Sequence, residues 1–421
     1  MISAPPAIEL NDALDQLPDY PFARLNCLLA TTRVDANRPP VLMSIGEPQQ
    51  PPPALIDEIL HASAHLWGKY PPVNGTEDFR AAVAGWLCRR YGLADRLVDP
   101  QTMILPVSGT REALFQVALL AVPRLRHGRA VPAVLIPNPF YAVYAGAAAM
   151  ARAEPVFLSA TPDTGFLPDL DALTPALLSR TALFYLCSPS NPQGAIADLA
   201  YLRRAIALAR HYGFVLVADE CYAEIYDRAA PPGLLEAADG DMTGLLVFNS
   251  LSKRSSAAGI RSGFVAGDPA LIRAFATLRS YGLAGVPLPI LAASAALWRD
   301  EAHVVESRDR YRARIDAAER ALSGRLGFYR PPGGFFLWLD VGDGEAAAAK
   351  LWQQAAIKTL PGAYLARPDR DGNNVSARYL RIALVHEPEI IFENCALIAA
   401  ILDPAPVRAQ GPATSPGDQP R

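Results

Sequence analysis

Short hydrophobic runs alternate with amphipathic stretches between about residue 100 and residue 270. Each run has the length and the Val, Leu, Ile and Phe content of a buried strand. The runs are residues 103–107, 133–137, 183–187, 214–219, 245–249 and 263–267. Between two of them, residues 199–212 place four apolar side chains on one helical face, as in a helix packed on a sheet. The pattern predicts an α/β domain with a mostly parallel sheet flanked by helices.

The pattern changes after about residue 286. A helical stripe there consists of Tyr311, Ile315, Ala318 and Leu322, and residues 335–341 and 379–385 resemble strands. This predicts a second, smaller α+β domain. The predicted organisation is an N-terminal arm that belongs to the small domain, a large domain, the small domain and a disordered, proline-rich tail, over residues 1–45, 46–285, 286–403 and 404–421.

Charge and composition exclude several classes of protein. The 39 Lys and Arg residues are balanced by 42 Asp and Glu residues, so there is no basic excess for binding nucleic acid. No stretch approaches the roughly 18 apolar residues of a membrane-spanning helix, and the N-terminus does not resemble a secretory signal. We therefore predict a soluble, cytoplasmic protein. Its five cysteines are widely spaced without a CxxC motif, which predicts reduced thiols and no metal site.

A lysine surrounded by hydrogen-bond donors is the strongest chemical signal. Lys253 lies in SLSKRSSAAGIRSGF, directly after a buried strand, with Ser250, Ser252 and Arg261 nearby in sequence. Hydroxyl and guanidinium donors suit a phosphate dianion, and a desolvated amine suits a Schiff base. Together they suggest a phosphorylated aldehyde as the ligand.

Asp219 ends the apolar run FVLVAD, at the edge of the sheet where ligands bind in α/β proteins. The carboxylate either caps the next helix or pairs with a cation such as a pyridinium nitrogen. Tyr222, three residues later, lies where its hydroxyl can reach the oxygen of such a ring.

Three other turns follow predicted strands. Ser108, Gly109 and Thr110 offer hydroxyl and backbone N–H groups at a helix N-terminus, either as a simple cap or as an anion site. Asn191, in CSPSNPQG, is a turn residue or a donor to a phenolic oxygen. The ring of Tyr141, in NPFY, either packs in the core or lies against a flat heterocycle.

Taken together, these motifs resemble the fold-type-I, class I/II aminotransferases, which use pyridoxal 5′-phosphate, over about residues 15–402. The segments YPFARL, SIGEP, NPFY, CSPSNPQG, DECYAEIY and SLSKRS are most similar to the N-succinyldiaminopimelate aminotransferases of bacterial lysine biosynthesis. The resemblance implies amino transfer between glutamate or 2-oxoglutarate and N-succinyl-L,L-diaminopimelate or its keto acid, N-succinyl-2-amino-6-ketopimelate.

The resemblance also implies roles for individual residues. Lys253 binds the cofactor as a Schiff base and shuttles a proton, and Arg381 binds the substrate α-carboxylate with help from Gly46 and Asn191. Tyr70 reaches the phosphate in a neighbouring subunit, which implies a homodimer. The implied cofactor-binding residues are Tyr70, Ser108, Gly109, Thr110, Tyr141, Asn191, Asp219, Tyr222, Ser250, Ser252, Lys253 and Arg261.

Two departures from the family pattern keep other substrates open. Gln193 replaces a small residue, and the stretch beginning at Tyr281 is unusually apolar, which bears on the substrate side chain. Arg24 is either a second carboxylate-binding residue or a surface residue. Aspartate, aromatic or kynurenine-type aminotransferases and carbon–sulfur lyases remain alternatives. No GxGxxG motif follows a strand, which disfavours a dinucleotide-binding dehydrogenase.

Overall fold

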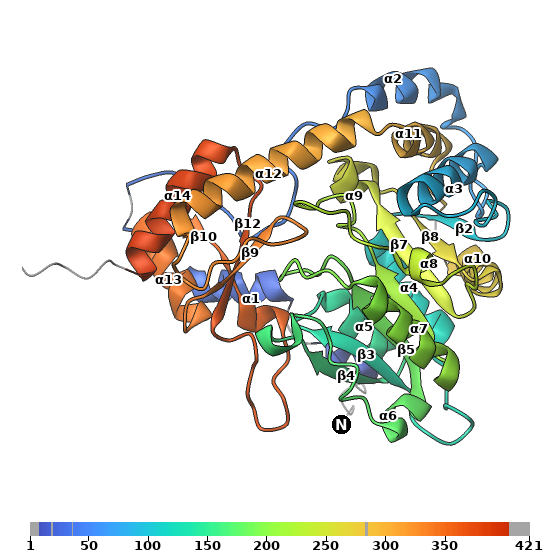
Figure 1. Cartoon of the computed structure of the whole chain (residues 1–421), viewed down its shortest axis with the longest axis horizontal. Coiled ribbons are helices and arrows are strands. Elements are labelled where there is room, and N and C mark those ends of the chain that lie inside the picture. The colour runs from blue at the N-terminus through green and yellow to red at the C-terminus, as the bar shows by residue number, and fades with distance from the viewer. Residues whose placement is uncertain (1–7, 18–19, 36, 283–284, 404–421) are drawn as a thin grey trace, which may run out of the picture.

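The computed structural model describes residues 8–17, 20–35, 37–282 and 285–403, and it has two lobes (Figure 1). The large lobe is built on a seven-stranded sheet. Its strands, in spatial order, are β2 (Ile104–Val107), β8 (Gly263–Gly267), β7 (Leu245–Ser250), β6 (Val215–Asp219), β5 (Thr181–Cys187), β3 (Ala133–Asn138) and β4 (Glu154–Ser159). Strand β8 pairs antiparallel with both of its neighbours, β2 and β7, and the other neighbouring strands of this sheet pair in parallel. The prediction of a mostly parallel sheet is confirmed.

Helices cover both faces of this sheet because its inner strands are apolar on both sides. One face packs against α4 (Thr110–Ala121), α5 (Ala142–Met150) and α10 (Pro269–Gly282). The other packs against α3 (Glu77–Tyr91), α6 (Pro175–Arg180), α7 (Leu199–Tyr212), α8 (Leu234–Ala237) and α11 (Leu288–Arg299). Neighbouring residues alternate between the two cores: Phe184 faces one and Tyr185 the other. Helix α7 begins and ends where its apolar face predicts.

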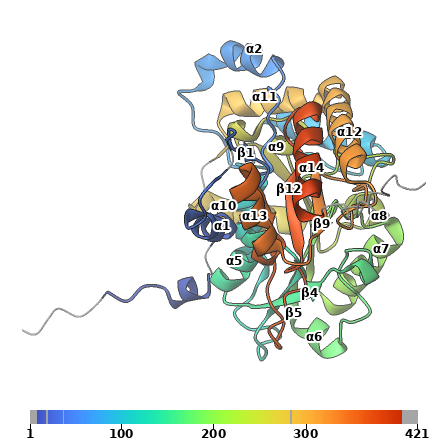
Figure 2. The same ribbon diagram turned by 90° about the vertical axis from the view of Figure 1, so that its left-hand side faces the viewer.

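The small lobe contains an antiparallel sheet of β11 (Leu360–Pro361), β12 (Tyr379–Ala383) and β9 (Phe336–Asp340). Helices α12 (Ala302–Leu322), α13 (Gly344–Ala355) and α14 (Pro388–Leu402) enclose its core. The predicted stripe of Tyr311, Ile315, Ala318 and Leu322 is buried along α12, as expected. Figure 2 shows α12 and α14 side by side.

The chain before the large lobe joins the small lobe. Helix α1 (Pro21–Ala30) packs against α13, and β1 (Val41–Leu42) pairs in parallel with β10 (Ile357–Lys358). Helix α2 (Leu55–Ala62) packs on α11, whereas α9 (Leu251–Arg254) directly follows β7. Short 3₁₀ helices occur at Asp12–Gln16, Ala64–Leu66, Pro162–Thr164, Ala258–Ile260 and Gly362–Leu365. The domain boundaries given above stay predictions, and the tail predicted over 404–421 lies outside the described residues.

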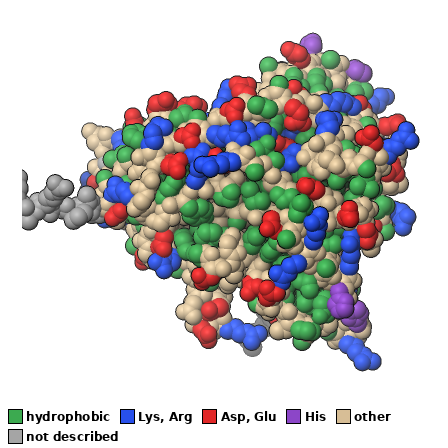
Figure 3. Space-filling model, viewed as in Figure 1, with side chains coloured by type: hydrophobic (Ala, Val, Ile, Leu, Met, Phe, Trp, Pro, Cys, Tyr) green, Lys and Arg blue, Asp and Glu red, His purple; other side chains and the backbone are tan. Residues whose placement is uncertain are grey.

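The surface shows no segregation of charge on the face drawn in Figure 3, where acidic and basic side chains are interspersed. This agrees with a formal net charge of -3. Within the described ranges, every helix is too short or too polar to cross a bilayer.

Candidate active site

A cavity of about 560 Å³ lies where the carboxyl ends of β5, β6 and β7 face the small lobe. The small lobe and the segment that follows β1 contribute Gly46, Phe336, Leu360 and Arg381 to its wall. The carboxyl edge of the sheet is therefore where the predicted side chains meet, as expected for an α/β protein.

Most of the predicted site residues line this one cavity: Gly46, Thr110, Tyr141, Asn191, Asp219, Tyr222, Ser250, Ser252, Lys253, Arg261 and Arg381. Ser108 and Gly109 directly precede Thr110, and the carbonyl of Ser108 accepts a hydrogen bond of 3.3 Å from Arg261 Nη2. Tyr70 is fully exposed and does not line the cavity. Sequence positions from residue 46 to residue 381 thus converge on one place.

Lys253 projects into the cavity from α9, a helix of only four residues. Its Nζ donates to the carbonyl of Gly46 and lies 5.4 Å from the centre of the Phe335 ring. Burial lowers the pKa of the amine to about 8, and the positive charge of Arg381 also lowers it. At pH 7 about one-tenth of this amine is therefore uncharged, and only the uncharged form can act as a nucleophile or a proton acceptor.

Asp219 is buried at the end of β6. Its carboxylate accepts a 2.6 Å hydrogen bond from Tyr144 Oη and a 3.3 Å bond from the N–H of Cys221. Among the described residues, no Lys or Arg forms an ion pair with it, and burial raises its pKa. Residues 221–224 form a turn rather than a helix, so helix capping does not explain this carboxylate. A cationic ligand atom would supply the missing partner.

Hydrogen-bond donors gather between the end of β7 and the N-terminus of α4. Ser250 Oγ donates to Ser252 Oγ at 2.9 Å, and Arg261 Nη2 lies 3.2 Å from a carboxylate oxygen of Glu112. Gly109 has a φ of +86°, and a Cβ there would lie 2.3 Å from Arg261 Nη2. Only glycine lets the guanidinium approach this turn so closely. The cluster has the composition of a phosphate site.

Arg381, on β12, is a buried cation without a carboxylate partner among the described residues. It donates to Asn191 Oδ1 at 3.0 Å and to the carbonyl of Ser44 at 2.7 Å, and it lies 4.3 Å over the ring of Phe336. Burial lowers its pKa to about 10. A substrate carboxylate at this wall of the cavity would satisfy the guanidinium.

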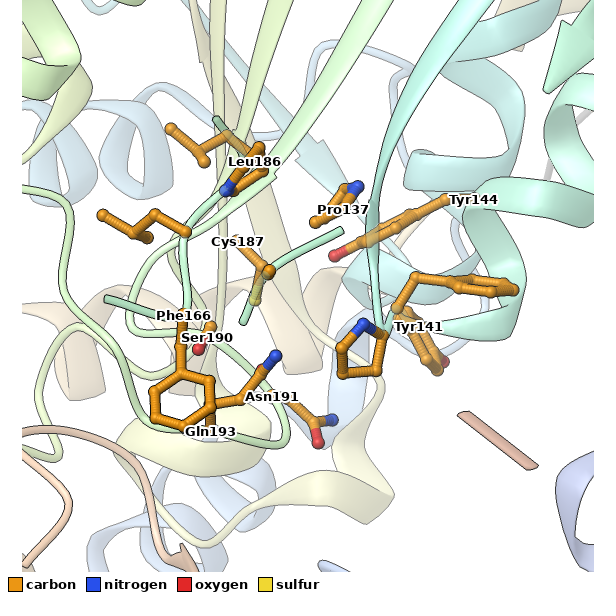
Figure 4. A pocket seen from close by; sticks show the side chains of 14 residues that line it. Pro137, Tyr141, Tyr144, Phe166, Leu186, Cys187, Ser190, Asn191 and Gln193 are labelled. Carbon is orange, nitrogen blue, oxygen red and sulfur yellow. The ribbon is translucent and has the colours of Figure 1, made fainter. Parts of the chain in front are cut away.

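A smaller pocket adjoins the cavity and has Tyr141, Tyr144, Cys187 and Asn191 in its wall as well (Figure 4). Burial raises the pKa of Tyr141 to about 12, and its hydroxyl accepts a 2.8 Å hydrogen bond from Arg111 Nε. Gln193, the departure from the family pattern, lines only the smaller pocket. It therefore leaves the wall of the main cavity unchanged.

Two residues that line the cavity, Tyr144 and Arg111, were not predicted from the sequence. Tyr144 holds Asp219 from the next turn after Tyr141, so the helical spacing in NPFYAVY was the available signal. Arg111 lines the cavity immediately after Thr110. Arg24, by contrast, does not line it: its guanidinium lies 3.8 Å from Glu345 and 4.0 Å over the Tyr364 ring. These contacts agree with the surface role for Arg24, and its role in binding a substrate carboxylate stays a prediction.

These residues fit pyridoxal 5′-phosphate. The unpaired, buried Asp219 suits the ring nitrogen, the donors around Gly109 and Arg261 suit the phosphate, and the desolvated Lys253 suits the aldehyde.

Known proteins share this architecture. The family model "Aminotransferase class I and II" matches residues 38–391. The chain is 34% identical to 4-dedimethylamino-4-oxo-anhydrotetracycline transaminase OxyQ of Streptomyces rimosus, over 89% of this chain and 97% of that protein. It is 30% identical to an LL-diaminopimelate aminotransferase of Moorella thermoacetica, over 92% of this chain and 97% of that protein. An aminotransferase from Neisseria meningitidis with a known crystal structure is 38% identical in sequence. The two structures superimpose with a TM-score of 0.89, over 93% of this chain and 100% of that chain. The chain belongs to the class I and II aminotransferases, which depend on pyridoxal phosphate.

Proposed function

We propose that this aminotransferase moves the amino group between glutamate and N-succinyl-2-amino-6-ketopimelate, giving 2-oxoglutarate and N-succinyl-L,L-diaminopimelate in lysine biosynthesis. One observation carries the choice of substrates with two carboxylates. Arg381 and Arg111 both line the cavity, and neither forms an ion pair with a carboxylate among the described residues. One guanidinium is available for the α-carboxylate and a second for an acidic group farther along the substrate.

The proposed roles follow from the contacts described above. Pyridoxal 5′-phosphate, when bound, supplies an electrophilic carbonyl carbon and an electron-withdrawing ring. Asp219 would hold the ring nitrogen in its protonated form, Asn191 and Tyr222 would donate to the phenolic oxygen, and Tyr141 would lie against the ring. Asn191 Nδ2 and Tyr222 Oη are 3.5 Å apart, which suits two groups that share one oxygen.

Lys253 is the proposed acid–base group. With the cofactor bound, its Nζ would stand at the substrate Cα, where it would accept the Cα proton and hold it for return, and the cofactor ring would supply the electron withdrawal that makes this proton acidic. Arg381 fixes the α-carboxylate, with the N–H of Gly46 beside it. Ser108, Gly109, Thr110, Ser250, Ser252 and Arg261 would hold the phosphate.

A second candidate is amino transfer from unacylated LL-diaminopimelate. The relative from Moorella thermoacetica carries that name. Glu47 also lines the cavity, and no cation pairs with it among the described residues. A free distal ammonium group would match this carboxylate, whereas a succinylated nitrogen carries no charge there.

The visible absorption of the cofactor-loaded protein separates these candidates. Glutamate, N-succinyl-L,L-diaminopimelate, LL-diaminopimelate and aspartate are added to separate samples. Bleaching by glutamate and the succinylated compound, without bleaching by the other two, is expected. If LL-diaminopimelate bleaches the band and its N-succinyl derivative does not, the second candidate is favoured. Bleaching by aspartate would overturn both candidates. Pyruvate and ammonia released from a cysteine conjugate without a keto acid would indicate a carbon–sulfur lyase.

The proposal includes a cytoplasmic homodimer in which Tyr70 reaches the phosphate of the neighbouring site. Its complete exposure in the single chain leaves its hydroxyl available to a partner. Sedimentation of the loaded protein should give twice the chain mass. In a mixture of Tyr70→Phe and Lys253→Ala subunits, part of the activity should return, because one of the two sites in a mixed dimer then carries both native residues.

A further inference from the structure

Helix α9, which carries Lys253, is bonded to the corner between α11 and α12, which consists of Asp300 and Glu301. The residue after the lysine, Arg254, is 1% exposed. Its guanidinium donates to the carbonyl of Leu297 at 2.6 Å, to the carbonyl of Asp300 at 3.2 Å and to Glu301 Oε1 at 2.9 Å. Two of these acceptors are carbonyls at the C-terminal end of α11, where a cation is favoured.

Aromatic rings enclose the same guanidinium. Its Cζ lies 5.7 Å from the ring centre of Trp86 and 5.0 Å from that of Trp298. Both indoles are buried in the core of the large lobe. Arg254 is therefore held mainly by buried groups, the two carbonyls and the two indoles, and Glu301 is its one exposed partner among those named.

A second tie comes from the next residue. Ser255 Oγ lies 2.8 Å from His303 Nε2, and the other ring nitrogen of His303 contacts Asp300 Oδ2. Ser255 is 1% exposed and lines neither pocket described above, so this Ser, His and Asp arrangement is a structural link and not a nucleophile. The acidic groups that act on Arg254 at this corner are Glu301, Glu224 and Asp300.

A helix of four residues has almost no stability of its own. The position of Lys253 Nζ beside Gly46 consequently depends on what holds the residues around it. Upstream, the N–H of Leu251 donates to the carbonyl of Ser262 at 3.2 Å. Downstream, the ties are those of Arg254 and Ser255. From the corner, α12 runs on to the small lobe and packs against α14, as Figure 1 shows.

We propose that Arg254 is a positioning residue for Lys253: by anchoring α9 to the α11–α12 corner, it fixes the lysine amine at the reacting atoms. This rests on the proposed role of Lys253. The corner thereby serves both as the support of the lysine and as the start of the helix that leads to the small lobe.

The test compares Arg254→Lys and Arg254→Met with the same substitutions at Arg279. Arg279 is also buried, 3% exposed, but it lies on α10 and donates to Gln116. We expect kcat of the Arg254→Met holoenzyme to fall about 100-fold, with KM changed less than about threefold, since small displacements of a catalytic group have effects of this size. Arg254→Lys should recover part of the loss.

Two further readouts distinguish positioning from general destabilisation. The rate at which the apo-protein forms its visible band with pyridoxal 5′-phosphate, and the pH midpoint of that band, should change in the Arg254 variants only. If Arg254→Met does not fold, Ser255→Ala and Glu301→Gln remove single ties and should show smaller changes in the same direction. Arg254 variants that match the Arg279 variants in all three measurements would overturn the inference. Failure of the wild-type protein to form the band would instead overturn the proposed function.

Discussion

The two ends of the cavity are built in different ways. At the cofactor end, Asp219 and Ser250 terminate β6 and β7, which are neighbours in one sheet, and Lys253 follows three residues later. At the substrate end, Arg111 comes from α4, Arg381 from β12 in the other lobe, and Glu47 from the segment after β1. The cofactor end thus depends on one sheet, whereas the substrate end depends on how two lobes sit together.

This difference predicts two kinds of mutational effect. Changes at the cofactor end should affect every substrate equally, because the chemistry at Cα is common to all of them. Changes at the substrate end should raise KM, and those that contact only the distal group should discriminate between substrates.

The largest expected effect is that of Lys253→Ala. Without the amine there is no group at the substrate Cα to accept the proton, so kcat should fall by about 10⁴-fold or more for all amino acids. Single-turnover absorbance measurements with glutamate test this, and circular dichroism checks the fold. A variant that transfers amino groups at the wild-type rate would refute the assignment of the lysine.

Arg381→Lys should have the next largest effect. Lysine keeps the charge but loses the planar fork that binds a carboxylate through two parallel hydrogen bonds. We expect kcat/KM to fall about 100-fold, and equally for dicarboxylic and monocarboxylic amino acids, since all carry an α-carboxylate. Arg378→Lys is the matched control, because Arg378 pairs with Asp340 on the surface. A loss confined to glutamate would mean that Arg381 binds the distal carboxylate.

Arg111→Gln should have a smaller and selective effect. KM for glutamate should rise about tenfold, with kcat nearly unchanged, while KM for norvaline, which lacks the distal carboxylate, should change less than about twofold. Steady-state kinetics with both donors provide the measurement. Arg204→Gln, which removes a surface pair with Asp171, serves as the control. Equal changes for both donors would exclude a role in side-chain recognition.

The sequence predicted the cofactor end better than the substrate end for a physical reason. A polar residue after a continuous apolar run, such as Asp219 after VLVA, is placed by the strand that precedes it. Strand β4 was missed because Glu154 and Pro155 begin it and its residues are only partly buried at the edge of the sheet. An edge strand needs no continuous apolar run.

The substrate end depends on tertiary contacts that no local pattern contains. Arg111 occupies an exposed position in the first turn of α4, and the sequence there predicts only a solvent-exposed helix residue. Arg24 follows Tyr20 and Phe22, which do line the cavity, but the turn of α1 directs it to Glu345 on α13. Arg381 was identified by its family motif rather than by its spacing.

The smallest expected effect concerns pH and links the two ends. With the pKa of Lys253 lowered to about 8, its neutral fraction falls from about nine-tenths at pH 9 to about one-tenth at pH 7. The rate of band formation after mixing apo-protein with pyridoxal 5′-phosphate should therefore rise with pH, with a midpoint near 8, and level off above about pH 9.

Arg381 contributes to that low pKa through its positive charge. In Arg381→Gln, the midpoint of the rate profile should move to higher pH, because protonating Lys253 becomes easier when the neighbouring cation is removed. Arg378→Gln should leave the midpoint where it is. A wild-type midpoint near the usual lysine pKa would show that the amine is solvated. An unchanged midpoint in Arg381→Gln would show that the charge of Arg381 does not affect the protonation of Lys253. The two ends of the cavity would then be independent in their electrostatics as well as different in how they are built.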